Sequence, residues 1–292
     1  MTVTADAMRT ESGDPQVVTG WSGSPEYFQI REYQEFVPEA VVDVLHGRVA
    51  GVMFRGMVKP EVCTELAGRF WDSPHRMTRG VEAPGYYMGA YTWEKPTAQY
   101  LDDSEKFDEP LLDVLDVKDN PLQAFYQGLS EALGKEGAIV RRSRHEGRKG
   151  CRALLRSWHG AGKYALAPHD DNSQLTQPGQ TDFEIQRVGD RPVAALNICL
   201  ENSDGGRLVY WNMQADLESK RRLGVQYTGS AYPMETLEGI EQKWVTVNTG
   251  DVYVFNGSHI HAVEPNTDPE LRRTSLAGML GFIDDETVVS WT

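Results

Sequence analysis

The feature that most restricts the fold of this chain is a histidine and an aspartate two residues apart, His169 and Asp171, with a further histidine, His261, far downstream. Residues two apart point to the same side of an extended strand, and their Cα atoms lie about 6.6 Å apart. Two side chains at this spacing can bind one ion, and a histidine from another strand can complete one face of its coordination sphere. The pattern therefore predicts that two strands distant in sequence lie side by side.

The second half of the chain consists of short apolar segments separated by glycine turns, such as Gly205-Gly206 and Gly250-Asp251. The expected strands are residues 152–158, 165–171, 193–200, 207–211, 244–247, 252–255 and, as the last core strand, 272–282. A short helical insert is expected over Asp216 to Arg222. Many short strands with glycine turns favour an antiparallel double sheet, a jelly roll or cupin-like double-stranded β-helix, over about 151–292.

The first half of the chain, to about residue 150, has helical patterns. Residues 50–56 predict a short buried strand, and Pro60 then begins a helix with an apolar stripe of Val62, Leu66, Ala67 and Phe70. Helical spacing recurs over 111–115 and 121–133. We therefore expect an α+β protein with a mainly β core. We expect one domain over residues 25–292 after a flexible arm over residues 1–24.

Charge and composition exclude several classes of partner. The formal net charge of −14 opposes binding to nucleic acid or anionic membranes. No apolar run approaches the about 20 residues of a membrane span, and the N-terminus lacks the features of a signal peptide. Three widely spaced cysteines argue against a disulfide framework and a cysteine-rich zinc site. We expect a cytoplasmic protein that acts on a small molecule; the sequence leaves a homodimer open.

Two neighbours compete for the candidate ligand positions. Two histidines and one carboxylate, with the opposite face left open, are the ligand set of non-heme Fe(II) sites. Asp170 is the rival of Asp171, but it points to the opposite strand face from His169. His259 shares a strand face with His261 and is its rival. The alternative for all these side chains is an ordinary hydrogen-bonded place in the core.

A pair of arginines follows the second histidine on the last predicted strand. The planar fork of arginine binds a carboxylate through two parallel hydrogen bonds, each contributing about 1.5–3 kcal/mol. Arg273, with Ser275 on the same strand face, is our first choice for holding the far carboxylate of a dicarboxylate co-substrate. Arg272, paired with Thr274, is the alternative if the pleat runs the other way. Asn197, on an interior strand, is a further candidate to hydrogen-bond the co-substrate.

These segments resemble the Fe(II)/2-oxoglutarate-dependent oxygenase superfamily, and more narrowly the freestanding aliphatic halogenases of hapalindole-type alkaloid biosynthesis with their hydroxylase relatives. The matching segments are residues 51–56, 205–210, 250–257, 261–263, 272–274 and 290–291. The resemblance implies that His169, Asp171 and His261 bind iron, with 2-oxoglutarate and O2 as co-substrates. It favours His261 over His259, because the sequence His-x-Val-x-Pro is the superfamily's usual continuation.

One position departs from the halogenase pattern. Those halogenases carry glycine where this chain has Asp171, and chloride takes the vacated iron position. The resemblance therefore implies hydroxylation of an unactivated C–H bond of a small molecule, an amino acid or a specialised metabolite, with release of succinate and CO2. The alternatives are a halogenase, desaturase or cyclase of the same family, and a metal-binding jelly roll without redox chemistry.

Several side chains near the predicted site are candidates to contact the substrate, although each also fits an ordinary place in the core or on the surface. They are Trp158, Asn172 and Trp211, followed by Tyr164 and Trp244. The segments 172–192 and 213–243 are long enough to act as lids over the site.

Overall fold

The computed structural model describes residues 16–80, 84–159, 163–180, 182–268 and 270–292. Its large sheet has ten strands, all antiparallel to their neighbours except in the pairs β2–β3 and β6–β18. The order is β2 (Ile30–Tyr33), β3 (Gly51–Phe54), β15 (Val252–Asn256), β11 (Ala194–Glu201), β17 (Thr274–Phe282), β9 (Leu154–Trp158), β5 (Gly85–Met88) and β4 (Met77–Thr78), with β18 (Thr287–Trp291) beside β17 and β6 (Ile139–Arg142) beside β18.

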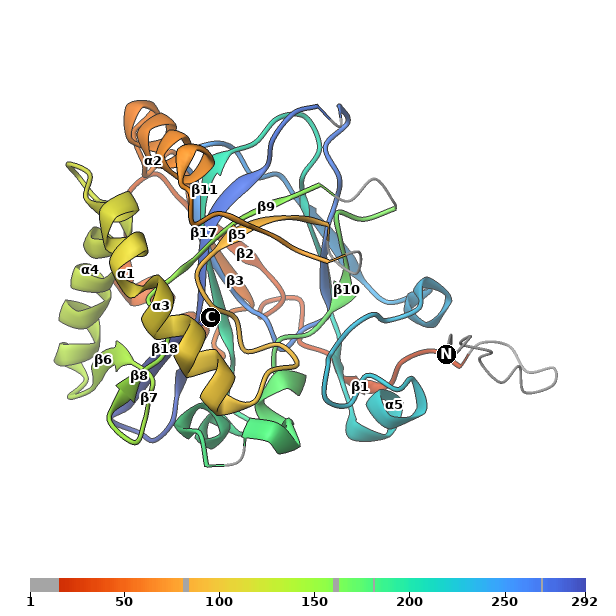
Figure 1. Cartoon of the computed structure of the whole chain (residues 1–292). Helices are drawn as coiled ribbons and strands as arrows, with labels where there is room; N and C mark the ends of the chain where they lie inside the picture. The colour runs from red at the N-terminus through yellow and green to blue at the C-terminus, as the bar shows by residue number, and fades with distance from the viewer. Residues whose placement is uncertain (1–15, 81–83, 160–162, 181, 269) are drawn as a thin grey trace, which may run out of the picture.

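A second, antiparallel sheet packs against the large one (Figure 1). Its order is β10 (Leu166–His169), β16 (His261–Val263), β12 (Leu208–Trp211) and β14 (Gln242–Val245). Two short ribbons lie outside both sheets: β1 (Gly20–Trp21) with β13 (Gln214–Ala215), and β7 (Arg144–His145) with β8 (Arg148–Lys149). This arrangement confirms the antiparallel double sheet expected from the glycine turns.

Four helices cover the outer face of the large sheet, and a fifth lies beyond the small one (Figure 1). They are α1 (Pro38–Leu45), α2 (Pro60–Asp72), α3 (Thr97–Leu115), α4 (Pro121–Lys135) and α5 (Leu217–Arg222). Proline stands at the start of α1, α2 and α4, where its missing N–H has no intrahelical role. Among the described residues, no helix is long and apolar enough to cross a membrane.

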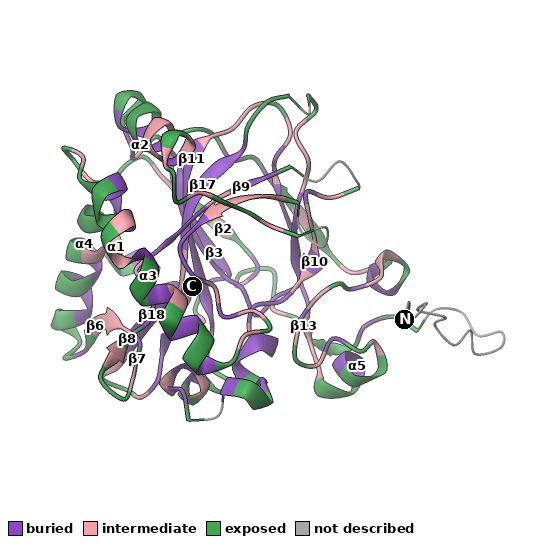
Figure 2. Ribbon diagram, in the orientation of Figure 1, coloured by how far each residue is buried: buried purple, intermediate pink, exposed green. Residues whose placement is uncertain are grey.

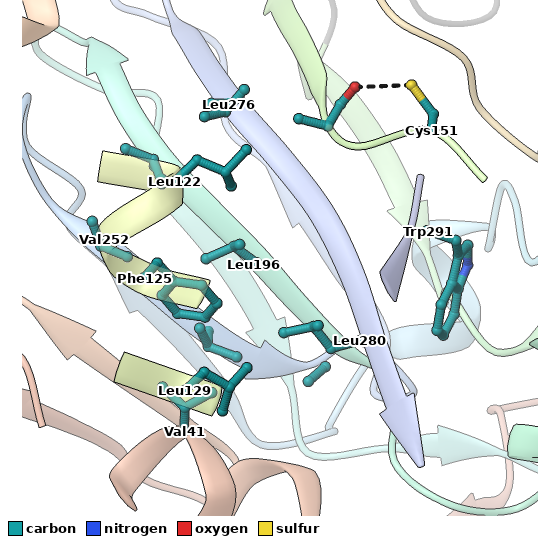
Figure 3. Close-up of a cluster of buried hydrophobic side chains, with 14 of the residues drawn as sticks. Val41, Leu122, Phe125, Leu129, Cys151, Leu196, Val252, Leu276, Leu280 and Trp291 are labelled. Carbon is teal, nitrogen blue, oxygen red and sulfur yellow. Dashed lines mark hydrogen bonds between the residues drawn. The ribbon is translucent and has the colours of Figure 1, made fainter. Parts of the chain in front are cut away.

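The central strands of the large sheet are buried on both faces, as the purple strands at the centre of Figure 2 show. On β11, Leu196 and Ile198 face the helices, whereas Ala195 and Asn197 face the small sheet. Burial on both sides explains why these strands read as nearly continuous apolar runs. Figure 3 shows the outer layer, where side chains of α1 and α4 pack on β11, β15 and β17. The inner layer forms the walls of a cavity between the sheets.

Three parts of the fold differ from the sequence-based expectation. The helix expected over 111–115 is only the end of α3. The earlier part of α3 was not predicted, because acidic residues interrupt its apolar pattern and Pro110 lies inside the helix. A further strand, β18, follows the segment expected to be the last core strand. The flexible arm expected over 1–24 is packed on the rest of the fold from Val18, which is buried, and β1 within it pairs with β13. Residues 1–15 lie outside the described residues.

The long connections carry short 3-10 turns and, apart from the first two residues of β14, no strand of the two sheets. The segment after β10 has three of them, Ser173–Thr176, Pro178–Gln180 and Glu184–Val188. The 213–243 segment carries β13, α5 and one 3-10 turn, Met234–Leu237. These segments were expected as lids, and their contacts with the cavity are described below.

Candidate metal centre

His169, Asp171 and His261 meet at one end of the cavity between the sheets. His169 ends β10 and His261 begins β16, and the two residues are antiparallel partners. Nε2 of His169 lies 3.9 Å from Oδ1 of Asp171, and Nε2 of His261 lies 3.6 Å from Oδ2. One ligand atom from each residue lies within 4.8 Å of the other two. These donors are close enough for one divalent cation to contact all three.

The two imidazoles are oriented by the backbone just before them. Nδ1 of His169 donates to the carbonyl of Ala167 at 2.8 Å, and Nδ1 of His261 donates to the carbonyl of His259 at 2.9 Å. Nε2 is then left unprotonated on the side that faces Asp171. Burial lowers the pKa of both histidines to about 4, so both are neutral at pH 7. Neutral imidazole is the form that binds a metal.

Asp171 lies beyond the end of β10, where a glycine leaves room for its carboxylate. Its backbone N–H donates to the carbonyl of Gly257 at 2.8 Å, and a Cβ at Gly257 would lie 2.2 Å from Oδ2. Burial raises the pKa of Asp171 to about 6, and His169 and Arg156 oppose this shift. The carboxylate is therefore mostly ionised at pH 7 and supplies one negative charge to the cluster.

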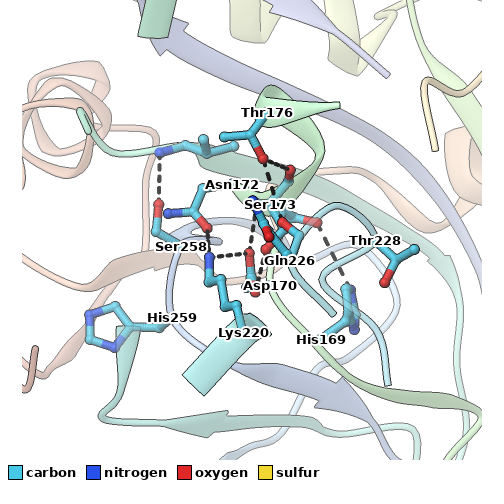
Figure 4. A network of polar contacts seen from close by, with 12 residues as sticks. His169, Asp170, Asn172, Ser173, Thr176, Lys220, Gln226, Thr228, Ser258 and His259 are labelled. Carbon is cyan, nitrogen blue, oxygen red and sulfur yellow. Dashed lines mark hydrogen bonds and ion pairs between the residues drawn. The ribbon is translucent and has the colours of Figure 1, made fainter. Parts of the chain in front are cut away.

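Asp170, the rival ligand, turns away from the cluster into a buried polar network (Figure 4). Its Oδ1 accepts from the backbone N–H of Ser173 at 2.8 Å and from Nζ of Lys220 at 3.2 Å. Its Oδ2 accepts from the Tyr232 hydroxyl at 2.6 Å. Lys220 also donates to Asn172 at 2.6 Å. The carboxylate of Asp170 is thus fully engaged and fixes the backbone beside Asp171.

His259, the other rival, also lies away from the cluster. Its Nδ1 donates to the carbonyl of Trp211 at 3.1 Å, and its Nε2 lies 3.2 Å from the Tyr27 hydroxyl. Its ring is fully buried among Tyr27, Phe28 and Tyr210. It packs behind the metal cluster as part of the core.

Ser275 on β17 and Arg273, the residue just before this strand, lie on the inner side of the large sheet, as expected for one of the two pleat directions. Nε of Arg273 donates to the carbonyl of Gly206 at 2.8 Å, and Nη2 donates to the Tyr253 hydroxyl at 3.2 Å. The hydroxyl of Ser275 is buried and has no hydrogen-bond partner among the described residues. A buried hydroxyl without a partner costs about 1–3 kcal/mol, so it indicates a place for a polar ligand atom. Arg272 points outward.

The family comparison agrees with this geometry. The model of the carrier-protein-independent halogenase WelO5 family matches residues 28–292. The chain belongs to this halogenase family. It is thereby a member of the Fe(II)/2-oxoglutarate-dependent oxygenase superfamily, which confirms the resemblance drawn from the sequence.

Relatives of this halogenase-family chain include amino acid dioxygenases. It is 29% identical to the L-isoleucine 3(1)-dioxygenase of Pantoea ananatis (strain AJ13355) over 258 residues. The matched region covers 85% of this chain and 84% of the relative. Two crystal structures of an N-substituted L-amino acid dioxygenase from Burkholderia ambifaria AMMD, one with alpha-KG, have TM-scores of 0.56 and 0.53. They are 13% and 15% identical and cover 87% of this chain and 91% of their own, so this likeness is one of fold.

Three residues that we expected at the site of this halogenase-family chain lie elsewhere. Trp211 is on the outer face of the small sheet, where the 213–243 segment covers it, because Leu208 and Tyr210 take the inner positions. Asn172 is engaged by Lys220 and does not line the cavity. Arg272 lies over the Trp71 ring at 4.1 Å, outside the barrel.

The two weaker aromatic candidates are also outside the cavity. Tyr164 packs against the edge of Trp211, and Trp244 is exposed beneath Arg207. Trp158 and Asn197, in contrast, do line the cavity, so their expected roles stay open as predictions.

The sequence reasoning missed Arg156, an inner-face residue of β9 that lines the same cavity as His169 and Asp171. A signal was present, because an arginine interrupts an apolar strand at the same parity as Trp158. Tyr253, whose hydroxyl contacts Arg273, was likewise passed over as a strand residue.

The 213–243 segment forms a wall of the cavity by lying along β10. The backbone N–H of Asp170 donates to Gly229 at 3.0 Å, and that of Tyr232 donates to Pro168 at 2.9 Å. Gly229 has φ +66°, and a Cβ there would lie 2.3 Å from the carbonyl oxygen of Asp170. Thr228 and Ser230, on either side of Gly229 in the chain, line the cavity. The segment is therefore joined to the strand that carries the candidate ligands.

Proposed function

We propose that this chain is an Fe(II)/2-oxoglutarate-dependent dioxygenase that hydroxylates an unactivated C–H bond of a free amino acid. The observation that carries the proposal is the convergence of two neutral histidines and one ionised carboxylate at the end of a cavity whose wall includes Tyr253, with the buried Arg273 bonded to the Tyr253 hydroxyl. The amino acid class is supported by the isoleucine dioxygenase relative, which this chain matches over most of its length.

The donor set fits iron. His169, Asp171 and His261 would hold it through Nε2, a carboxylate oxygen and Nε2, the ligand set typical of non-heme Fe(II) oxygenases. When bound, iron with 2-oxoglutarate and O2 would supply the oxidation of C–H to C–OH, with succinate and CO2 as co-products. The chain's own contribution is to hold two neutral imidazoles and one carboxylate on one side of the metal position. The opposite side is left open for small reactants.

The far carboxylate of 2-oxoglutarate would be held by Arg273 and Ser275. Gly206 and Tyr253 already fix the guanidinium, so little side-chain freedom is lost when it binds a carboxylate. The unpartnered Ser275 hydroxyl would donate to the same carboxylate. Asn197, which lines the cavity between this end and the metal end, stays our candidate for a further contact.

An apolar wall would select the substrate and its reacting bond. The cavity is lined by Trp93, Trp158, Leu166, Val263 and Met279. Such a surface suits an aliphatic side chain, which it would remove from water. Because one oxidant can attack many C–H bonds, the bond that lies nearest the metal in this pocket would decide the product.

Hydroxylation is favoured over halogenation by Asp171. The family name makes halogenation the second candidate, but the carboxylate occupies the position that the halogenases leave to chloride. A product with the isotope pattern of chlorine, formed only in chloride, would reverse this preference.

The test uses the full chain with Fe(II), 2-oxoglutarate and a panel of amino acids that includes L-isoleucine. We expect one or more amino acids to stimulate succinate release and to yield a product heavier by one oxygen atom. Turnover that persists without 2-oxoglutarate, or a panel in which nothing stimulates succinate release, would contradict the proposal. A cytoplasmic location and the single domain over 25–292 stay predictions.

A further inference from the structure

Arg156 has its guanidinium inside the active-site cavity, with no carboxylate within ion-pair distance among the described residues. Its Nη2 donates to Oδ1 of Asn197 at 3.0 Å, and its Nε is buried without a hydrogen-bond partner. The guanidinium lies over the ring of Trp158, 5.2 Å from its centroid. A neutral amide and an aromatic ring orient the group, but neither neutralises its charge.

Three partly buried arginines outside the cavity are each paired with a carboxylate, whereas Arg273 is held by neutral groups. Arg55 contacts Asp251 at 2.7 Å, Arg141 contacts Glu184 at 2.6 Å, and Arg152, close to β9 in the chain, contacts Asp108 at 2.9 Å. A charge removed from water without a counter-ion is unfavourable, so natural proteins retain it where a ligand supplies the partner. Burial lowers the pKa of Arg156 to about 10, and the group still carries its charge at neutral pH.

The cavity offers no internal counter-ion beyond the metal cluster. Among its described lining residues Asp171 has the single carboxylate side chain, and the proposed function assigns it to the metal. Arg156 on β9 pairs in register with Ser275 on β17, so its Cα lies beside a residue proposed to bind 2-oxoglutarate. Its guanidinium extends from there to Asn197. An anion with a planar, two-oxygen group would satisfy both Nε and the remaining Nη hydrogens.

We propose that Arg156 is a second carboxylate-binding residue of this cavity, distinct from Arg273, and that Asn197 and Trp158 hold its guanidinium in position. The inference rests on the proposed function, which supplies two molecules that carry carboxylates: the amino acid substrate and 2-oxoglutarate. Either source satisfies the same chemistry, and the experiment separates them.

The first arm measures binding to the full chain loaded with Zn(II), which has no redox chemistry, by calorimetry. The probes are 2-oxoglutarate alone, then L-isoleucine in the presence of 2-oxoglutarate. We expect Arg156→Gln to weaken one of the two affinities by about 10- to 100-fold, the loss of one or two charge-assisted hydrogen bonds. Arg156→Lys should recover part of the loss. The matched control, Arg152→Gln, removes an arginine outside the cavity and should leave both affinities unchanged.

The second arm identifies the source by removing the carboxylate from the substrate. If Arg156 binds the amino acid, the wild type should prefer L-isoleucine to L-isoleucinamide by a similar factor, and Arg156→Gln should nearly abolish that preference. If Arg156 binds 2-oxoglutarate, the preference should stay while the 2-oxoglutarate affinity falls. A loss of packing would not change the ratio between acid and amide.

Unchanged affinities for both probes in a folded Arg156→Gln protein would overturn the inference. If that variant does not fold, Arg156→Lys decides, because it keeps the charge but lacks the fork: equal affinities to the wild type would also overturn it. The proposed function fails separately, if the wild type turns over no amino acid; the 2-oxoglutarate titration remains informative in that case.

Discussion

The two ends of the cavity are built in different ways. At the metal end, His169, Asp171 and His261 are each held by a backbone carbonyl nearby, those of residues 167, 257 and 259 respectively. The other end is formed by Arg156, Asn197, Tyr253 and Ser275, from four strands of the large sheet, and by Arg273, the residue before β17. Strand register brings the four strand residues together. The metal end concentrates metal donors, whereas the other end concentrates cations.

This contrast teaches that the cavity is complementary to a molecule with negative charge away from the metal. It also explains why the two ends differ in sensitivity. A change at the metal end should alter metal affinity, and a change at the cationic end should alter the affinity for carboxylates with the metal still bound. The predictions below use this separation.

The largest effect is expected for Asp171→Ala. Loss of the single charged donor should weaken Fe(II) binding beyond the about 10- to 100-fold that loss of an outer contact causes, and succinate release coupled to substrate should disappear. Metal titration and the succinate assay measure both effects. Asp204→Ala, in an exposed loop, is the control; coupled turnover in the Asp171 variant would remove the assignment.

A smaller loss at the metal end is expected for Gly257→Ala. The added methyl group would lie 2.2 Å from Oδ2 of Asp171, so the carboxylate must move and metal affinity should fall by about 10- to 100-fold. Gly68→Ala is a matched control, because a Cβ there meets no atom within 4 Å and the helix should gain stability. An unchanged metal affinity would show that the clash is relieved elsewhere.

At the cationic end, Arg273→Gln should raise the KM for 2-oxoglutarate by about 10- to 100-fold and leave metal affinity unchanged. Arg272→Gln, one residue away but outside the barrel, should change the KM by less than about twofold. Steady-state kinetics on both variants make the comparison. Equal increases in KM would mean that both substitutions disturb the strand and that neither removes a direct contact with 2-oxoglutarate.

The smallest expected effect is a dependence of metal affinity on pH, which involves the metal end alone. Because burial raises the pKa of Asp171 to about 6, a proton competes with the metal below that pH, and affinity should fall by about tenfold per pH unit. Above about pH 7 it should be constant, since both histidines, with pKa values of about 4, are already neutral. Mn(II) titrations from pH 5 to 8 measure this. A loss that begins above pH 7 would contradict the assignment.

Local patterns in the sequence predicted the metal end well. The spacing of His169 and Asp171 needs only strand alternation, and Asp170 could be set aside for the same reason. The choice between Arg272 and Arg273 stayed open, because alternation does not say which face of a strand is inner. The structure shows the two sides of the strand: Thr274 bonds Glu201 on the outer side, and Arg273 and Ser275 lie inside, so Arg273 stays our candidate.

Features that depend on strand register could not be predicted. Trp211 was expected inside, yet Leu208 and Tyr210 take the inner positions of β12 and turn it outward. Arg156 stands out locally as an arginine within an apolar strand, but its place beside Ser275 emerges only when β9 is paired with β17. In both cases the unknown quantity was the face of a strand, which a single sequence with apolar residues on both faces does not encode.

The stretch Thr228–Tyr232 has a practical consequence for altering substrate range by directed evolution. Its residues have two roles. The backbone of residues 229 and 232 forms hydrogen bonds with β10 and the residue after it, whereas residues 228 and 230 line the cavity. Randomising 228 and 230 should therefore yield new selectivities in folded catalysts, whereas libraries at 229 should mostly yield inactive clones. Neighbouring codons in one short segment would then have opposite tolerance to change.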